Sequence, residues 1–203
     1  MITSRMALDD GFADVPAGKL ASVVTMLEMR SRVALRPQPA AGDWQLRRVE
    51  RPDADWYRRL FRHVGERWLW FSRLRMRVGE LTAIIHHPQV EVYALVHAGS
   101  DEGLLELDFR SGGECELAFF GLAPALLGRG AGRWLINRAI ELAWARPIRR
   151  FSTHTCTLDH PDALAFYIRS GFAPHGRQIE IADDPRLDGT LSRNAAPNVP
   201  IID

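Results

Sequence analysis

Three glycines at alternate positions, Gly128, Gly130 and Gly132, follow an apolar stretch and precede a helix-like pattern. Glycine lets backbone N–H groups approach an anion without interference from a Cβ atom, and the start of a helix adds unpaired N–H groups. Arg129 and Arg133 bring further positive charge to the same segment. The spacing predicts a loop that cradles phosphate groups, with a simple tight turn as the alternative.

The glycine spacing disfavours two well-known kinds of phosphate loop. Arg133 stands where the dinucleotide-binding fingerprint requires its third glycine. The segment also lacks the Gly-Lys-Ser/Thr ending of nucleoside triphosphate loops. We therefore expect a phosphate-bearing ligand of another kind.

The segment from Leu127 to Gly132 resembles the acyl-CoA loop of the GNAT acetyltransferase superfamily, whose pattern is Gln/Arg-x-x-Gly-x-Gly/Ala. Leu127 departs from that pattern because it replaces a polar first residue. A second segment, residues 155–172, is similar to the superfamily's signature Asn-x-x-Ala-x-x-x-Tyr-x-x-x-Gly-Phe. His160 stands at the asparagine position, and the matching residues are Ala163, Tyr167, Gly171 and Phe172. The chain thus resembles a bacterial GNAT member without an assigned substrate.

This resemblance implies an α/β (α+β) fold with a central, mostly antiparallel twisted sheet flanked by helices, in the order β-α-α-β-β-β-α-β-α-β. Hydrophobic periodicity read on its own indicates the same order. It predicts strands at residues 43–50, 90–97, 104–110, 114–122, 150–156 and 173–181. It predicts helices at residues 53–61 and 78–85, a third that Pro147 ends, and a fourth that begins near Pro161, is capped by Asp159 or His160, and ends at Gly171.

Three parts are expected along the chain. Residues 1–42 form an N-terminal accessory segment, in which the β-branched residues between Leu20 and Met29 favour a strand. Residues 43–184 form the acyltransferase domain, and residues 185–203 form an irregular C-terminal tail rich in proline and asparagine. The added strand and the tail are also candidates for a homodimer interface.

The resemblance implies acetyl-CoA (coenzyme A) as the co-substrate and no metal. The strand that ends at Leu122 is expected to lie beside the pantetheine arm, with backbone groups from Phe120 to Leu122 hydrogen-bonding to it. The expected cofactor-binding residues are Phe120, Leu122, Gly128, Arg129, Gly130, Ala131, Gly132, Arg133, His160 and Phe166.

Acyl transfer from a thioester to an amine needs a proton donor for the departing sulfur and a base for the amine. The resemblance implies Tyr167 as the donor, since a phenol stays protonated at neutral pH. Helix packing is the alternative role for this residue.

Glu116 is the expected base, on a strand face that simple alternation shares with Glu114, Ala118, Phe120 and Leu122. An exposed glutamate paired with an arginine is the alternative. His154 is a second candidate base because histidine titrates near neutral pH, and a chain of water molecules could replace both.

The acceptor is expected to be a small-molecule or peptide amine that binds near residues 57–76. Trp68, Trp70 and Phe71 form either an aromatic wall of that pocket or part of the core. Glu106, Glu114 and Glu116 would suit a cationic amine. Antibiotic, polyamine, amino acid and protein N-terminus all remain open.

Composition limits the other functional classes. The 203 residues are 46% apolar and 25% charged, which is typical of one soluble globular domain. A net charge of +1 argues against nucleic acid as a partner. No apolar run is long enough to span a membrane and no secretory signal is evident, so we expect a cytoplasmic protein. Cys115 and Cys156 are expected to be reduced thiols.

The sequence therefore favours an N-acyltransferase that moves an acetyl group from acetyl-CoA to a primary amine by direct transfer. A non-catalytic acyl-CoA-binding or sensing module is the main alternative, supported by the departures at Leu127 and His160. A purely structural interaction domain is a weaker alternative.

Overall fold

A computed structural model describes residues 10–38 and 43–203 of the chain. Residues 1–9 and 39–42, which belong to the expected accessory segment, lie outside the described part. The strands are β1 (Lys19–Met29), β2 (Trp44–Val49), β3 (Val90–His97), β4 (Ser100–Asp108), β5 (Glu114–Leu122), β6 (Arg150–Cys156) and β7 (Ala173–Asp183). The helices are α1 (Ala54–Gly65), α2 (Ser72–Arg75), α3 (Val78–Ile85), α4 (Ala131–Trp144) and α5 (Ala163–Arg169), with short 3₁₀ turns at Glu66–Trp68 and Pro124–Leu126.

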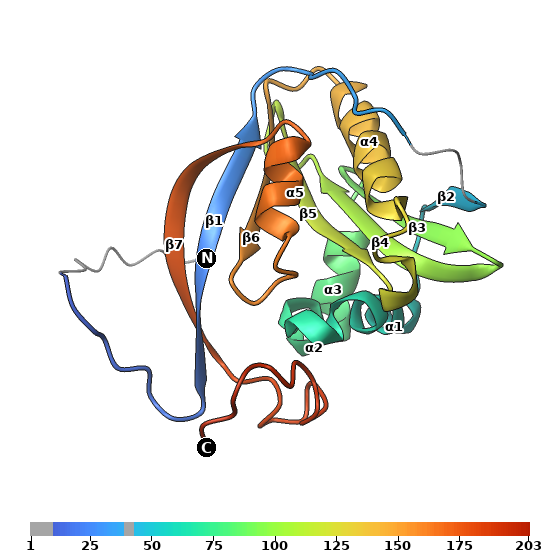
Figure 1. Ribbon diagram of the computed structural model, residues 1–203. Helices are drawn as coiled ribbons and strands as arrows, with labels where there is room; N and C mark the ends of the chain where they lie inside the picture. Colours follow the sequence, from blue (N-terminus) through green and yellow to red (C-terminus); the bar gives the residue numbers. More distant parts are fainter. Residues whose placement is uncertain (1–9, 39–42) are drawn as a thin grey trace.

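The seven strands form one open sheet in the order β2-β3-β4-β5-β6-β1-β7 (Figure 1). Neighbouring strands are antiparallel except for β5 and β6, which are parallel. The expected mixed α/β fold with a mostly antiparallel sheet is confirmed.

Local sequence signals explain several element ends. The Asp53 carboxylate accepts hydrogen bonds from the first amides of α1, as the N-cap rule requires. Gly171 takes the left-handed conformation (φ +100°) that ends α5. One expectation was wrong, and one element was not anticipated. Helix α5 begins at Ala163 with Asp162 at its N-cap, so Pro161 lies in the preceding turn, and the short helix α2 was not anticipated.

Helices cover both faces of the sheet (Figure 1). One core cluster packs α4 and α5 against the sheet and includes Leu105, Leu117, Ile136 and Tyr167. The second packs α1 and α3 against the opposite face and includes Phe61, Leu81, Val92 and Leu104. The alternation of side chains along β3 and β4 supplies both cores, which accounts for their nearly continuous burial.

Strand β1 lies inside the sheet although it comes first in the chain. It pairs with β6 from Val24 to Met29 and with β7 from Lys19 to Glu28. The strand expected between Leu20 and Met29 is confirmed, and it is an interior strand of the same sheet as the predicted acyltransferase domain. The domain limits at residues 43 and 184 stay a prediction.

Residues 30–38 follow β1, and we call this connection the strap. It runs from β1 toward helix α4 (Figure 1). The Asn137 side chain of α4 donates a hydrogen bond to the Arg36 carbonyl oxygen at 2.9 Å. The Arg133 guanidinium donates to the Pro37 carbonyl oxygen at 3.3 Å. These bonds fix the path of the strap beside the first two turns of α4.

The C-terminal tail has no helix or strand, as expected, but it is packed around one buried arginine. The Arg186 guanidinium pairs with Asp184 at 2.6 Å and donates to the carbonyl oxygens of Ala195 and Val199. A small apolar cluster joins the tail to Leu20 of β1 and to Leu69. The tail therefore supports the segment between α1 and α2.

Candidate active site

An opening between β5 and β6 defines the candidate site. The two strands pair only from Glu114 to Glu116 and from Arg150 to Ser152. Beyond these residues β5 continues to pair with β4 as far as Leu122, whereas β6 continues to pair with β1 as far as Cys156. A cavity of about 750 Å³ occupies the gap that results. It is lined by residues from both faces of the sheet.

A bulge in β5 decides which side chains face each side of this cavity. Phe119 lies opposite Glu106 and Leu117 lies opposite Leu107, so Ala118 is the extra residue. The expectation that Glu116, Phe120 and Leu122 share one face was therefore wrong. Glu116 lies on the face of Phe119, whereas Phe120 and Leu122 pack on the side of α4 and α5.

The glycine loop has the geometry of an anion cradle. Gly128 and Gly130 adopt left-handed φ angles of +74° and +88°. Gly130 is the N-cap of α4 and places no side-chain acceptor on the first amides of the helix. These amides and the positive end of the helix dipole are therefore available to bind an anion. A Cβ atom at Gly128 would meet nothing within 4 Å, so the loop surface is open.

The residues around the glycine loop that were expected to bind the cofactor divide into two groups. Arg133, Leu122 and Gly132 line the cavity, and Leu127 lines it with 37% of its surface exposed. Ala131 is buried in the core at the start of α4, and Arg129 is exposed outside the lining. The polar contact that the motif's first residue usually provides is absent at Leu127. The backbone cradle nevertheless fits a diphosphate.

Tyr167 lines the cavity from helix α5. It is 7% exposed and its ring contacts Phe120 and Phe166, with centroid distances of 6.2 and 5.5 Å. Burial raises the pKa of the Tyr167 phenol above its ordinary value. The phenol is therefore protonated at neutral pH, as a hydrogen-bond donor to sulfur must be.

Glu116 and His154, the two expected bases, lie together across the opening. The Glu116 carboxylate and His154 Nδ1 are 3.9 Å apart, and the two side chains are 49% and 44% exposed. Both line the cavity. The pair is thus within reach of a ligand from solvent, and either side chain is able to accept a proton.

An aromatic wall bounds the side of the cavity that faces α1 and α2. Trp68, Trp70 and Phe71 all line it and none of them is fully buried. The indole N–H of Trp70 donates to the Asp159 carboxylate at 3.0 Å. The Trp68 ring meets the His160 ring edge-on at 5.2 Å. These two contacts join the α1–α2 segment to the turn after β6.

His160 and Asp159 organise that turn. His160 Nδ1 accepts the backbone N–H of Asp162 at 3.1 Å, which is a role that an asparagine side chain also performs before a helix. The Asp159 carboxylate also accepts the Thr155 hydroxyl at 2.7 Å. Sequence reasoning missed this use of Asp159, for which a capping role was expected.

A buried ion pair lies below the aromatic wall and was not anticipated. Glu106 is 0% exposed and is bonded to the Arg73 guanidinium and to the Tyr57 hydroxyl. The Arg73 guanidinium also lies over the Phe119 ring, 4.9 Å from its centroid. A glutamate inside the apolar run of β4 was the available signal, because such a carboxylate needs a buried partner.

The three glutamates expected near a cationic acceptor behave differently from one another. Glu106 is neutralised by Arg73, and Glu114 pairs with Arg150 at 3.3 Å. Only Glu116 of the three lines the cavity. Glu180 of β7, which sequence reasoning did not single out, lines it as well.

Among the residues described, no group of His, Cys, Asp and Glu side chains is arranged to hold a metal ion. Within residues 10–38 and 43–203, none of the helices combines the length and apolar character that a membrane crossing demands.

The part of the chain that holds most of the site matches a protein-family model. The model of the acetyltransferase (GNAT) family matches residues 51–172. This range contains the glycine loop, Glu116, His154 and Tyr167. No curated protein sequence is similar enough to the chain to count as a match.

Solved structures with a similar fold are distant in sequence. A GCN5-related N-acetyltransferase from Sphaerobacter thermophilus is 14% identical with a TM-score of 0.59, and the match covers 80% of this chain and 52% of that one. A functionally unknown conserved protein from Staphylococcus epidermidis is 14% identical with a TM-score of 0.54, covering 82% of this chain and 63% of that one. An aminoglycoside acetyltransferase from an uncultured soil metagenomic sample, in complex with trehalose, is 14% identical with a TM-score of 0.52. The match covers 63% of this chain and 86% of that one.

The chain thus spans between half and two thirds of the length of the first two of these proteins. At sequence identities this low, the similarity shows only that the fold is shared.

Proposed function

Because the chain belongs to the acetyltransferase (GNAT) family, we propose that it transfers an acetyl group from acetyl-CoA directly to a primary amine. The observation that carries this proposal is that one cavity, between β5 and β6, holds all the candidate groups. Along β5 it extends from Glu116, which lies beside His154, to Leu122, after which the glycine loop follows. Tyr167 packs on Phe120 between these two positions. Each requirement of the reaction has a group in this cavity.

The cofactor end holds the co-substrate through backbone and aromatic groups. The amides at the start of α4 and the Arg133 guanidinium bind the diphosphate. Phe120 and Phe166, whose rings are 5.7 Å apart, flank the path of the pantetheine arm. When bound, acetyl-CoA supplies an acyl group that is activated as a thioester.

Residues that line the cavity accept one proton and donate another during the reaction. Glu116 or His154 accepts the proton that the amine nitrogen must lose as the C–N bond forms. Tyr167 donates its phenolic proton to the sulfur as the C–S bond breaks. Because burial raises the pKa of Tyr167, the phenol is fully protonated when the reaction begins.

The acceptor end favours a cationic amine. Glu116 and Glu180 line the cavity, and no arginine or lysine among the described residues lies within 4.0 Å of either carboxylate. The aromatic wall adds faces on which a cationic group can bind. The similar structure described as an aminoglycoside acetyltransferase is a reason to include aminoglycosides among the acceptors tested.

The test is release of free CoA thiol from acetyl-CoA in the presence of a panel of polyamines, aminoglycosides, amino acids and peptides. We expect saturable release with at least one cationic amine, and a large loss in the Glu116→Gln, His154→Ala double variant. Binding of acetyl-CoA without release for any amine would instead support the non-catalytic acyl-CoA-binding module. Absence of binding would reject both functions.

A further inference from the structure

Three arginines at the cofactor end of the cavity have no acidic partner among the described residues. Arg36, Arg133 and Arg169 all line the cavity, and none of them lies within 4.0 Å of a carboxylate of that part of the chain. The two arginines at the acceptor end differ, because Arg73 pairs with Glu106 and Arg110 pairs with Asp108 at 2.6 Å. Unneutralised arginines that converge on one end of a cavity indicate an anionic ligand group there.

These three arginines come from three separate elements. Arg133 lies in the first turn of α4, Arg169 is the last residue of α5, and Arg36 belongs to the strap. The hydrogen bond from Asn137 fixes the backbone at Arg36. The strap also passes directly over the end of α5, since a Cβ atom at Gly171 would lie 2.8 Å from Val33. The strap therefore places Arg36 near the end of α5, where Arg169 lies.

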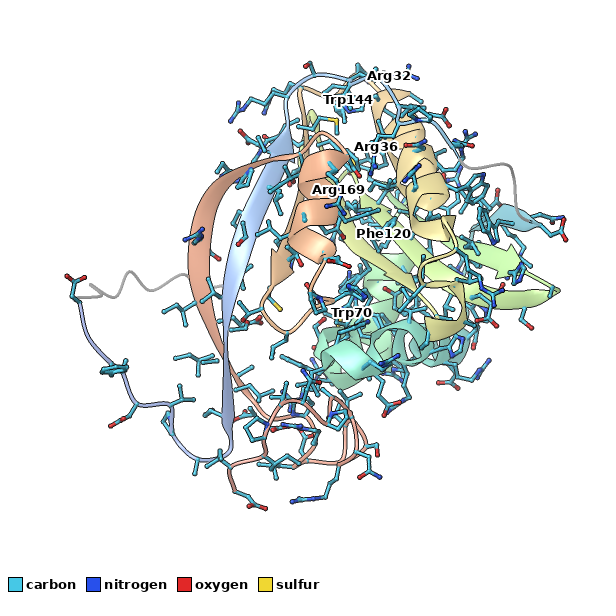
Figure 2. All side chains as sticks on the ribbon, viewed as in Figure 1. Arg32, Arg36, Trp70, Phe120, Trp144 and Arg169 are labelled. Atoms are coloured by element: carbon cyan, nitrogen blue, oxygen red, sulfur yellow. The ribbon has the colours of Figure 1, made fainter. Side chains whose placement is uncertain are left out.

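The backbone of Arg36 is fixed beside the second turn of α4, whereas the glycine loop precedes the first turn, so Arg36 lies farther along α4 than the loop. In Figure 2, Arg36 and Arg169 lie beside α4 and α5, Phe120 lies below them, and Trp70 lies lower still. Phe166, one helical turn before Arg169, lies within about 4 Å of where a side chain at Gly132 would begin. The groove from Phe120 past Gly132 therefore leads toward Arg36 and Arg169.

The chemistry of CoA accounts for all three arginines. The amides of the cradle and Arg133 suit its diphosphate, which leaves the separate phosphomonoester on the ribose without a cation. That group lies beyond the diphosphate from the thioester, as Arg36 and Arg169 do. We propose that Arg36 and Arg169 form a subsite for the 3′-phosphate and make the chain select CoA over dephospho-CoA. This inference rests on the proposed function.

The test is calorimetric titration of the full chain with CoA and with dephospho-CoA, which lacks only the 3′-phosphate. We expect CoA to bind at least about tenfold more tightly, the size of one charge-assisted contact. In the Arg36→Ala, Arg169→Ala double variant this ratio should fall toward one, through weaker binding of CoA and unchanged binding of dephospho-CoA. Arg36→Lys should keep part of the selectivity because it keeps the charge.

Arg32→Ala is the matched control, since Arg32 is an exposed arginine on the same strap that does not line the cavity. Its CoA to dephospho-CoA ratio should equal that of the wild type. Equal binding of the two ligands by the wild type, or full selectivity in the double variant, would overturn the subsite and leave the proposed acetyl transfer standing. Failure of both ligands to bind would overturn the proposed function and the subsite with it.

Thermal unfolding of each variant separates loss of binding from loss of fold. The Asn137 bond uses the backbone of residue 36, so the alanine variants should unfold within a few degrees of the wild type. A drop in affinity for both ligands together with a lower unfolding temperature would indicate that the arginines are structural, which contradicts the subsite.

Discussion

The two ends of the cavity use the same residue type in opposite ways. At the acceptor end Arg73 is buried, paired with Glu106 and packed on Phe119, so it has become part of the core. At the cofactor end Arg36 and Arg169 line the cavity without a carboxylate partner in the described chain. We infer that an acid within ion-pair distance, rather than the residue type, decides whether an arginine supports the fold or stays available to a ligand.

The largest effect is expected from Arg73→Ala. This change leaves Glu106 buried without its cation, which should lower the free energy of unfolding by about 3–5 kcal/mol. Arg169→Ala at the other end should change it by less than about 0.5 kcal/mol, because no partner loses a bond. Urea denaturation followed by tryptophan fluorescence measures both. Similar losses for the two variants would remove the contrast between the ends.

The next largest effect is expected at Tyr167, which lies between the two ends. Tyr167→Phe keeps the ring contacts with Phe120 and removes the proton donor, so kcat should fall by about a hundredfold. The KM values for both substrates should change little, because neither end is altered. Tyr93→Phe is the control, since Tyr93 is also buried but does not line the cavity. An unchanged kcat in Tyr167→Phe would assign this residue to packing alone.

A smaller effect is expected from Gly130→Val in the cradle. A side chain at a φ of +88° strains the loop and covers the amides of α4, so affinity for acetyl-CoA should fall at least about tenfold in calorimetry. Gly99→Val is a matched control, because Gly99 has a similar φ of +81° but lies in the turn between β3 and β4. If both variants bind acetyl-CoA equally well, the loop is a simple turn.

The smallest effect concerns the tail that supports the acceptor end. The Arg186 guanidinium lowers the pKa of Asp184, so this ion pair stabilises the fold above the ordinary carboxyl pKa of about 4. Its contribution is lost as the pH falls through the lowered pKa. Asparagine keeps an acceptor for Arg186, which also stays bonded to the carbonyl oxygens of Ala195 and Val199, so Asp184→Asn should cost only about 1 kcal/mol at pH 7. The difference from the wild type should shrink in acid denaturation series below pH 4. A difference independent of pH would exclude the ion pair as its cause.

What the sequence predicts well is local. The glycine loop and the segment from Ala163 to Phe172 are contiguous, so their spacing is preserved in the fold. Glu116 and His154 were expected near the site from their strands, and the structure brings them together. The face of Phe120 was predicted wrongly because one extra residue at Ala118 reverses the alternation, and no pattern in the sequence marks a bulge there.

What the sequence does not predict depends on segments that are distant along the chain. The proposed role of Arg36 in the phosphate subsite could not be predicted from the sequence. It depends on the position of β1 inside the sheet and on the path of the strap beside α4. Likewise the position of Leu69, which lines the cavity, depends on the tail that packs against it. Neither arrangement leaves a periodic or spacing signal, because each arises from tertiary packing.

The interior position of β1 has a consequence for biosynthesis. Its two hydrogen-bonding partners, β6 and β7, are the last two strands of the chain. At about 5–20 residues per second, β1 leaves the ribosome on the order of ten seconds before either partner has been made. During that interval both of its edges are unpaired and its apolar residues are exposed, which is the condition in which chaperones bind nascent chains and strands aggregate. The sheet is therefore complete only after β7 has been made, and shortening the chain before β6 would leave its first strand without either of these partners.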